Sequence, residues 1–167
     1  MNVCRPARLA LMAGVALALA ACQKEQPSAP EATSASPAAP ETKPGLSLNG
    51  ARLVLPAVKG NPGAAYFTLV NGSERPVAIA AVDVAGAGMA MLHETKDMGG
   101  HSSMTDMAAP ELKPGESMAF APGGKHVMVD DLPERLKPGG TVEMTITFAD
   151  GDKLSAPLKV EAPGGGL

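Results

Sequence analysis

Two of the three His and three of the ten Met lie within fourteen residues, "MLHETKDMGGHSSM" (residues 91–104). The third His, His126, is followed two positions later by Met128. Imidazole nitrogen and thioether sulfur are both metal donors. The thioether is soft and uncharged and selects Cu(I), whereas imidazole serves copper or zinc. A mixed set made of His93, Met104, His126 and Met128 therefore indicates Cu(I) rather than Zn²⁺, Ca²⁺ or Mg²⁺.

The local sequence around these donors predicts how they are held. "KHVMVDDL" has the alternation of a strand, so His126 and Met128 leave one face while the Val residues between and after them take the other. His93 ends a second strand-like run, "GMAMLHET", and Met104 follows the Gly-rich loop "DMGGHSS". We therefore expect two segments to bring four donors together.

The full pattern is His93, ten residues, Met104, twenty-one residues, His126, one residue and Met128. It resembles the H-x10-M-x21-H-x-M signature of the periplasmic copper chaperones called PCuAC at all four positions. "AAYFTLVN" also resembles an early strand of that family, and "LHET" the residues around its first His. The resemblance covers roughly residues 46–160.

This resemblance implies a cupredoxin-like β domain that binds one Cu(I) and has no enzymatic activity. It also implies a recipient, the copper subunit of cytochrome c oxidase or its assembly factors. Two features depart from the family. Ser102 stands where members often carry a further Met, and the C-terminal "EAPGGGL" has neither His nor Met, so no copper site is expected there.

Short alternating segments, separated by turn signals such as "NGS", "KPGE" and "DGD", predict an all-β fold. The clearest is residues 141–148, in which every second residue is apolar. This spacing of strands favours an antiparallel β-sandwich or barrel. The expected strands are "ARLVL", "AAYFTLVN", "PVAIAAVDV", "ESMAFA", "KHVMVDDL", "TVEMTITFAD" and "KLSAPLKV", together with the run ending at His93.

The N-terminus has the features of a lipoprotein signal. Residues 1–21 join a positive start to an apolar run that is too short for a permanent span, and "LAAC" resembles a lipobox that ends at Cys22. Cys22 would carry the lipid and place the chain on the periplasmic side of the envelope. Gln23, rather than Asp, after it resembles an outer-membrane address. The alternative is a plain secretory signal cleaved near Ala21.

The remaining sequence sets the domain limits and excludes several partners. Residues 22–45, rich in Pro, Ala, Ser and Glu, predict a disordered tether, residues 46–162 the folded domain and residues 163–167 a flexible tail. The formal net charge is −3, and loss of Arg5 and Arg8 with the signal makes it −5, so no nucleic-acid partner is expected. With Cys4 removed and Cys22 acylated, the domain has no thiol for a disulfide or a blue-copper site.

Other His and Met residues are open to two interpretations. Met91 shares its face with His93 and could line the site without binding metal. A Met on a strand is more often core filler than ligand, which we expect for Met89, Met118 and Met144. Near the Gly-rich loop, Met98, His101 and Met107 could offer a secondary copper contact or simply face solvent. Glu94 could orient an imidazole.

Competing functions are less consistent with these residues. Ser102 and Ser103 lie near His101, but no acid stands where it would complete a hydrolase site. A zinc enzyme would use His and carboxylate ligands with an open position, whereas half of these donors are thioethers. Two alternatives remain: a copper-sequestering lipoprotein without a dedicated recipient, and a tethered structural module whose Met residues only pack.

Overall fold

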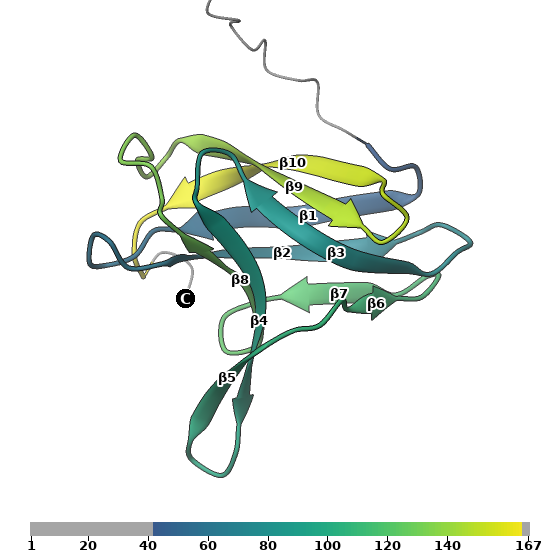
Figure 1. Ribbon diagram of the computed structural model, residues 1–167, viewed down its shortest axis with the longest axis horizontal. Coiled ribbons are helices and arrows are strands. Elements are labelled where there is room, and N and C mark those ends of the chain that lie inside the picture. The colour runs from purple at the N-terminus through teal and green to yellow at the C-terminus, as the bar shows by residue number, and fades with distance from the viewer. Residues whose placement is uncertain (1–41, 165–167) are drawn as a thin grey trace, which may run out of the picture. The chain divides into compact units, whose positions relative to one another are not determined.

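The computed structural model describes residues 42–164 of the chain and shows an all-β domain (Figure 1). Ten strands follow one another without a helix among the described residues. They are β1 (Leu46–Val54), β2 (Gly63–Asn71), β3 (Val77–Val84), β4 (Met89–Asp97), β5 (Ser102–Asp106), β6 (Glu111–Leu112), β7 (Ser117–Phe120), β8 (Lys125–Asp130), β9 (Thr141–Phe148) and β10 (Lys153–Glu161).

The strands form one mixed sheet in the order β5-β4-β8-β2-β1-β10-β9-β3-β6, with β7 also paired to β2. Only β1 and β10 run parallel, and the other pairs are antiparallel. The cupredoxin-like β fold expected from the sequence is confirmed, but the sheet does not close into a barrel. The parallel pair is a departure from the all-antiparallel arrangement that we expected.

One edge of strand β2 pairs with two different strands, β8 and β7. Its first residues pair with β8, from Gly63↔Val129 to Ala65↔Val127, while its last ones pair with β7. Strand β8 pairs in turn with β4, and β4 pairs with β5. As a result, the β4–β5 hairpin projects from the body of the domain (Figure 1).

The core lies where the alternation of the sequence predicts. On β9, Val142, Met144, Ile146 and Phe148 are all buried, and Met144 is fully buried. Half-buried strands alternate in this way because successive side chains point to opposite faces. Elsewhere in the core, the Phe67 and Phe120 rings stack with centroids 4.4 Å apart across the β2–β7 pair.

Two strands were not expected from the sequence. β6 has only two residues, and β5 begins at Ser102, within the end of the segment predicted to be a Gly-rich loop. All five β5 residues are exposed, so no apolar alternation marks the strand. β5 forms because a tight turn at Gly99 and Gly100, with φ of 69° and 94°, folds it back on β4. Glycine adopts such positive φ without steric cost.

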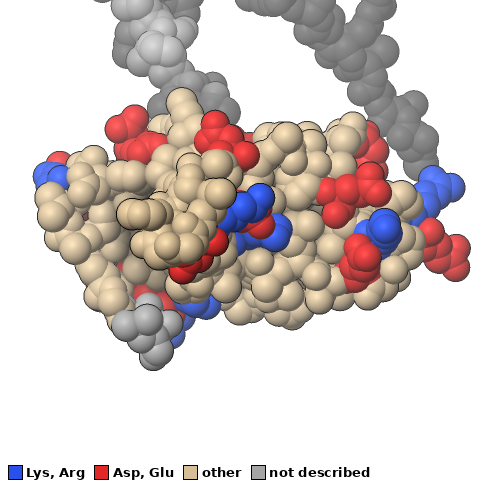
Figure 2. All heavy atoms as spheres, turned by 90° about the horizontal axis from the view of Figure 1, so that it is seen from below, with Lys and Arg blue, Asp and Glu red and all other residues tan. Residues whose placement is uncertain are grey.

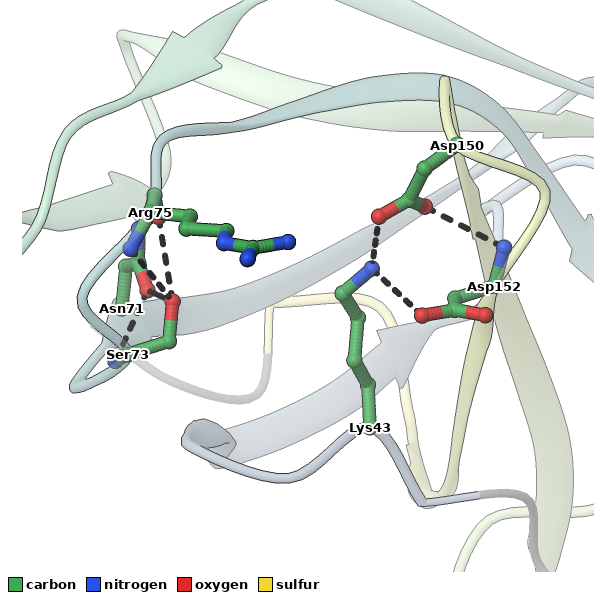
Figure 3. Close-up of polar contacts among 6 residues, drawn as sticks. All are labelled: Lys43, Asn71, Ser73, Arg75, Asp150 and Asp152. Atoms are coloured by element: carbon green, nitrogen blue, oxygen red, sulfur yellow. Dashed lines mark hydrogen bonds and ion pairs between the residues drawn. The ribbon is translucent and has the colours of Figure 1, made fainter.

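The N-terminal end of the described chain is fastened to the domain (Figure 3). Lys43 pairs with Asp150 and, at 2.8 Å from Nζ to Oδ2, with Asp152, and its ammonium lies 5.2 Å from the Phe148 ring centroid. The Gly45 carbonyl accepts a 2.7 Å hydrogen bond from the amide of Gly72. Residues 42–45, which are part of the predicted tether, thus contact the folded domain.

A buried amide stabilises the neighbouring β2–β3 turn (Figure 3). Asn71 is fully buried, and its Nδ2 donates to the carbonyls of Arg75 at 2.8 Å and Leu112 at 3.0 Å. Its Oδ1 accepts from the Ser73 hydroxyl at 2.6 Å. A buried polar group is tolerated when it is hydrogen-bonded in this way.

The signal, Cys22 and most of the expected tether lie outside the described residues, as do residues 165–167. Within residues 42–164, no helix is long and apolar enough to cross a membrane.

Candidate metal centre

Strands β5, β4 and β8 place the four predicted donors on one face of the sheet. His93 on β4 lies directly opposite His126 on β8 and, on its other side, opposite Asp106 on β5. Met128 is two residues from His126, and Met104 is two residues from Asp106. Because residues two apart on a strand share a face, all four donors leave the same side.

Three of the four donors line one surface pocket. His126, Met128 and Met104 border it, together with Pro62, Gly63, Ala64, Tyr66, Thr95 and Gly123. His93 does not line this pocket but lies beside it. Its ring centroid is 5.9 Å from that of His126, with the two rings inclined at 75°. The structure thus brings three donors to a common cavity and places the fourth next to them.

The ring nitrogens of His126 have distinct roles. Nδ1 lies 3.0 Å from the carbonyl oxygen of Gly124, which can only accept, so the imidazole donates from this nitrogen. The lone pair of Nε2 is then available to a metal. A backbone carbonyl that fixes the tautomer of a ligating His is common at metal sites.

His93 is buried without a hydrogen bond. Nε2 lies 2.9 Å from Oδ1 of Asp106, but the contact lacks hydrogen-bond geometry, and neither ring nitrogen has such a partner within the described residues. The residue is only 6% exposed. An unsatisfied buried polar group is costly, and a metal ion bound to one of these nitrogens would remove that cost.

The two thioethers are more accessible than the imidazoles. Met104 is 55% exposed on the projecting hairpin, Met128 is half-buried, and His126 is 7% exposed. No group of three or more His, Cys, Asp and Glu in residues 42–164 is placed to hold a metal. The donors that the sequence predicts beyond the two imidazoles are thioethers, and a neutral His and Met set would fit Cu(I).

Glu94 does not contact either imidazole. Its carboxylate lies 2.9 Å from Nζ of Lys125 and 3.0 Å from Nζ of Lys96. Hydrogen bonds from Lys125 and then Lys96 lower the pKa of Glu94 below its usual value. The idea that Glu94 orients a His is therefore wrong. The carboxylate that lies close to the His93 ring belongs to Asp106, on the paired strand β5. The sequence does not single out Asp106, because its position depends on the register of the unexpected hairpin.

The other Met residues have different surroundings. Met144 is in the core and Met118 packs against it, as expected. Met89 is 56% exposed at the start of β4, so the prediction that it fills the core is wrong. Met91 is half-buried opposite Met128 on the site face, and Met107 is half-buried just after β5.

Comparison with solved structures identifies the class of this domain. It is similar to the apo PCuAC domain from PmoF1, with a TM-score of 0.61 and 26% identity over 74% of this chain and 99% of that one. It is also similar to Cu(I)-DR1885 from Deinococcus radiodurans, with a TM-score of 0.58 and 28% identity over 71% and 79% of the chains. The copper-bound PCuAC domain from PmoF2, 24% identical, shares the fold, with a TM-score of 0.59 over 75% and 99% of the chains. The domain is thus of the PCuAC type.

The sequence comparison gives the family. The model described as "Putative lipoprotein LpqE-like" matches residues 46–160. The chain therefore belongs to the LpqE-like lipoprotein family, which is of the same PCuAC type. A relative from Leifsonia xyli subsp. xyli, "Putative lipoprotein Lxx21020", is 28% identical over 130 residues, which are 74% of this chain and 77% of that protein.

Proposed function

We propose that this protein is a copper chaperone that binds one Cu(I) through His93, Met104, His126 and Met128. The observation that carries the proposal is the placement of two imidazoles and two thioethers on one face of β5, β4 and β8. The solved relatives support it, since Cu(I)-DR1885 is 28% identical to this chain over 71% of its length. Copper here is the cargo of a binding protein, and no enzymatic step is required of the domain.

The exposure of the donors suits transfer rather than storage. Met104 lies on the projecting β4–β5 hairpin and is 55% exposed, whereas His93 and His126 are buried. A ligand from an acceptor could displace Met104 first, while the imidazoles still hold the ion. No thiolate is present in the domain, so each exchange replaces one neutral donor with another.

We further propose that Cys22 carries a lipid and holds the domain on the periplasmic side of the envelope, at the outer membrane. The lipobox-like "LAAC" and the lipoprotein family support this location. The proposed recipient is the copper subunit of cytochrome c oxidase or one of its assembly factors. This recipient comes from the resemblance to PCuAC chaperones.

The test is anaerobic titration of the purified full chain with Cu(I) against a competing chelator, followed by transfer. We expect one tightly bound Cu(I) per chain, a preference for Cu(I) over Zn²⁺ and release to an apo oxidase copper domain within minutes. Tight Zn²⁺ binding without Cu(I) uptake would refute the copper site. Retention of copper in the presence of every such acceptor would replace the chaperone with a copper-sequestering lipoprotein.

A further inference from the structure

The tip of the β4–β5 hairpin carries a second His and Met pair. Asp97 and Ser102 are the last registered pair of the two strands, so Met98 and His101 form the next pair outward and flank the Gly99–Gly100 turn. Their backbones are joined, because the amide of Met98 donates to the carbonyl of His101 at 2.9 Å. Side chains directly opposite each other on paired strands have Cβ atoms about 4.5–5.5 Å apart, close enough for one ion to contact both.

Packing does not explain either side chain. Met98 is 71% exposed, the most exposed of the large apolar residues within the described part of the chain. His101 is exposed, and no side-chain hydrogen bond or ion pair in residues 42–164 involves its ring. A large apolar side chain at the end of a projecting hairpin loses the benefit of burial. A ligand that binds sulfur and nitrogen would give both residues a role.

The turn holds the pair in place. A second hydrogen bond stabilises the Gly99–Gly100 turn, because the amide of Gly100 donates to Oδ1 of Asp97 at 3.1 Å. The backbone around Met98 and His101 is therefore ordered before any ion binds, which lowers the entropy that binding would cost.

The pair does not belong to the first site. Alternation along β4 places Met98 on the face of Glu94 and Lys96, and His93 on the opposite face. Lys96, a cation on that face, lies 3.0 Å from a carboxylate oxygen of Glu94, which compensates its charge. Acidic and basic side chains are interspersed on the side toward which the hairpin projects (Figure 2), so no extended patch of one sign repels a cation there.

We propose that Met98 and His101 form a second Cu(I) site of lower affinity at the hairpin tip. The proposal rests on the proposed function only in taking copper as the cargo. One thioether and one imidazole select the same soft ion as the first site. Two exposed donors hold it more weakly than four partly buried ones, so the tip exchanges copper faster than the first site does.

The test uses the full chain labelled with ¹³C at the Met methyl groups, titrated anaerobically with Cu(I). The first equivalent is expected to shift the methyl signals of Met104 and Met128, and the second that of Met98. The double variant Met98→Leu/His101→Asn should bind one equivalent fewer and leave the first equivalent unchanged. Met89→Leu, which replaces an exposed Met away from the tip, is the matched control and should bind both.

The two proposals fail in different ways. A Met98 signal that stays fixed at two equivalents, or a double variant that binds as much Cu(I) as the control, would overturn the tip site. If the Met98 signal shifts while those of Met104 and Met128 do not, the tip site stands and the proposed four-donor site is refuted.

Discussion

The carboxylate of Asp106 lies 2.9 Å from Nε2 of His93, across the β4–β5 pair. The His93 side chain is 8% exposed, whereas that of Asp106 is 89% exposed. Neither ring nitrogen of His93 forms a hydrogen bond within residues 42–164, so both keep a free position for the proposed metal. A carboxylate beside a ligating imidazole helps to set the orientation of the ring.

We therefore predict that Asp106→Asn weakens Cu(I) binding by up to about tenfold and leaves the fold unchanged. Partners of ligating His residues typically contribute about 10–100-fold in metal affinity, and the exposure of Asp106 places it at the low end. Competition with a Cu(I) chelator measures the effect. Asp83→Asn, an exposed substitution on β3, is the control. A loss as large as that of His93→Ala would make Asp106 a ligand, and an unchanged affinity would show that the contact has no role.

A second prediction separates ligands from core residues. Met128→Ala should weaken Cu(I) binding strongly with little effect on unfolding, because Met128 is half-buried beside the pocket. Met144→Ala should lower the free energy of unfolding by about 2–5 kcal/mol, because this fully buried side chain would leave a cavity. Denaturant unfolding and Cu(I) titration of both variants check this. Unfolding of Met128→Ala, with Met144→Ala silent, would mean that the two faces have been assigned the wrong way round.

The strands that the sequence predicted are those with one buried face. In β9, apolar and polar residues alternate because the core covers one side only, and the pattern alone identified the strand. In β5 every residue is exposed, so the strand exists only through its pairing with β4. The donor set stays a prediction from the spacing of the His and Met residues, and the pairing of β5, β4 and β8 places its four members on one face. The contact between His93 and Asp106 could not be predicted, since it depends on a two-residue turn within what resembled a loop.

The ion pairs of Lys43 should give the domain a characteristic pH dependence. Burial lowers the pKa of Lys43, but Asp150 and Asp152 raise it overall above its ordinary value of 10.5. The hydrogen bond from Lys43 lowers the pKa of Asp150 below 3.8. The lowered pKa of Asp150 stabilises the fold at pH values above the ordinary carboxyl pKa. This stabilisation is lost as the pH falls through the folded-state pKa. The raised pKa of Lys43 stabilises the fold at pH values below 10.5. This stabilisation is lost as the pH rises through the folded-state pKa.

We therefore predict that Lys43→Met lowers Tm by a constant, small amount at neutral pH. The difference from the unmodified protein should shrink at pH values below that ordinary carboxyl value and again at strongly alkaline pH. Thermal unfolding followed across the pH range checks this. Lys59→Met is the control, because the Lys59–Glu134 ion pair is exposed on both sides and should contribute little. Equal pH profiles for the two variants would show that the Lys43 contacts do not stabilise the domain.

The last prediction concerns where the tether ends. Lys43 pairs with Asp150 and Asp152, and the Gly45 carbonyl accepts a hydrogen bond from the Gly72 amide, so we expect the folded domain to begin before β1. Deletion of residues 23–41 should leave Cu(I) affinity and Tm unchanged, whereas deletion of residues 23–45 should lower Tm by removing these contacts. In cells, both should reduce the copper content of the proposed oxidase recipient, because the domain would be held too close to its lipid anchor. A Gly/Ser segment in place of residues 23–41, equal in length, should restore delivery. Normal copper delivery by the deletion variants would show that the length of residues 23–41 is not needed for delivery. Equal Tm values for the two deletions would place the start of the domain at β1.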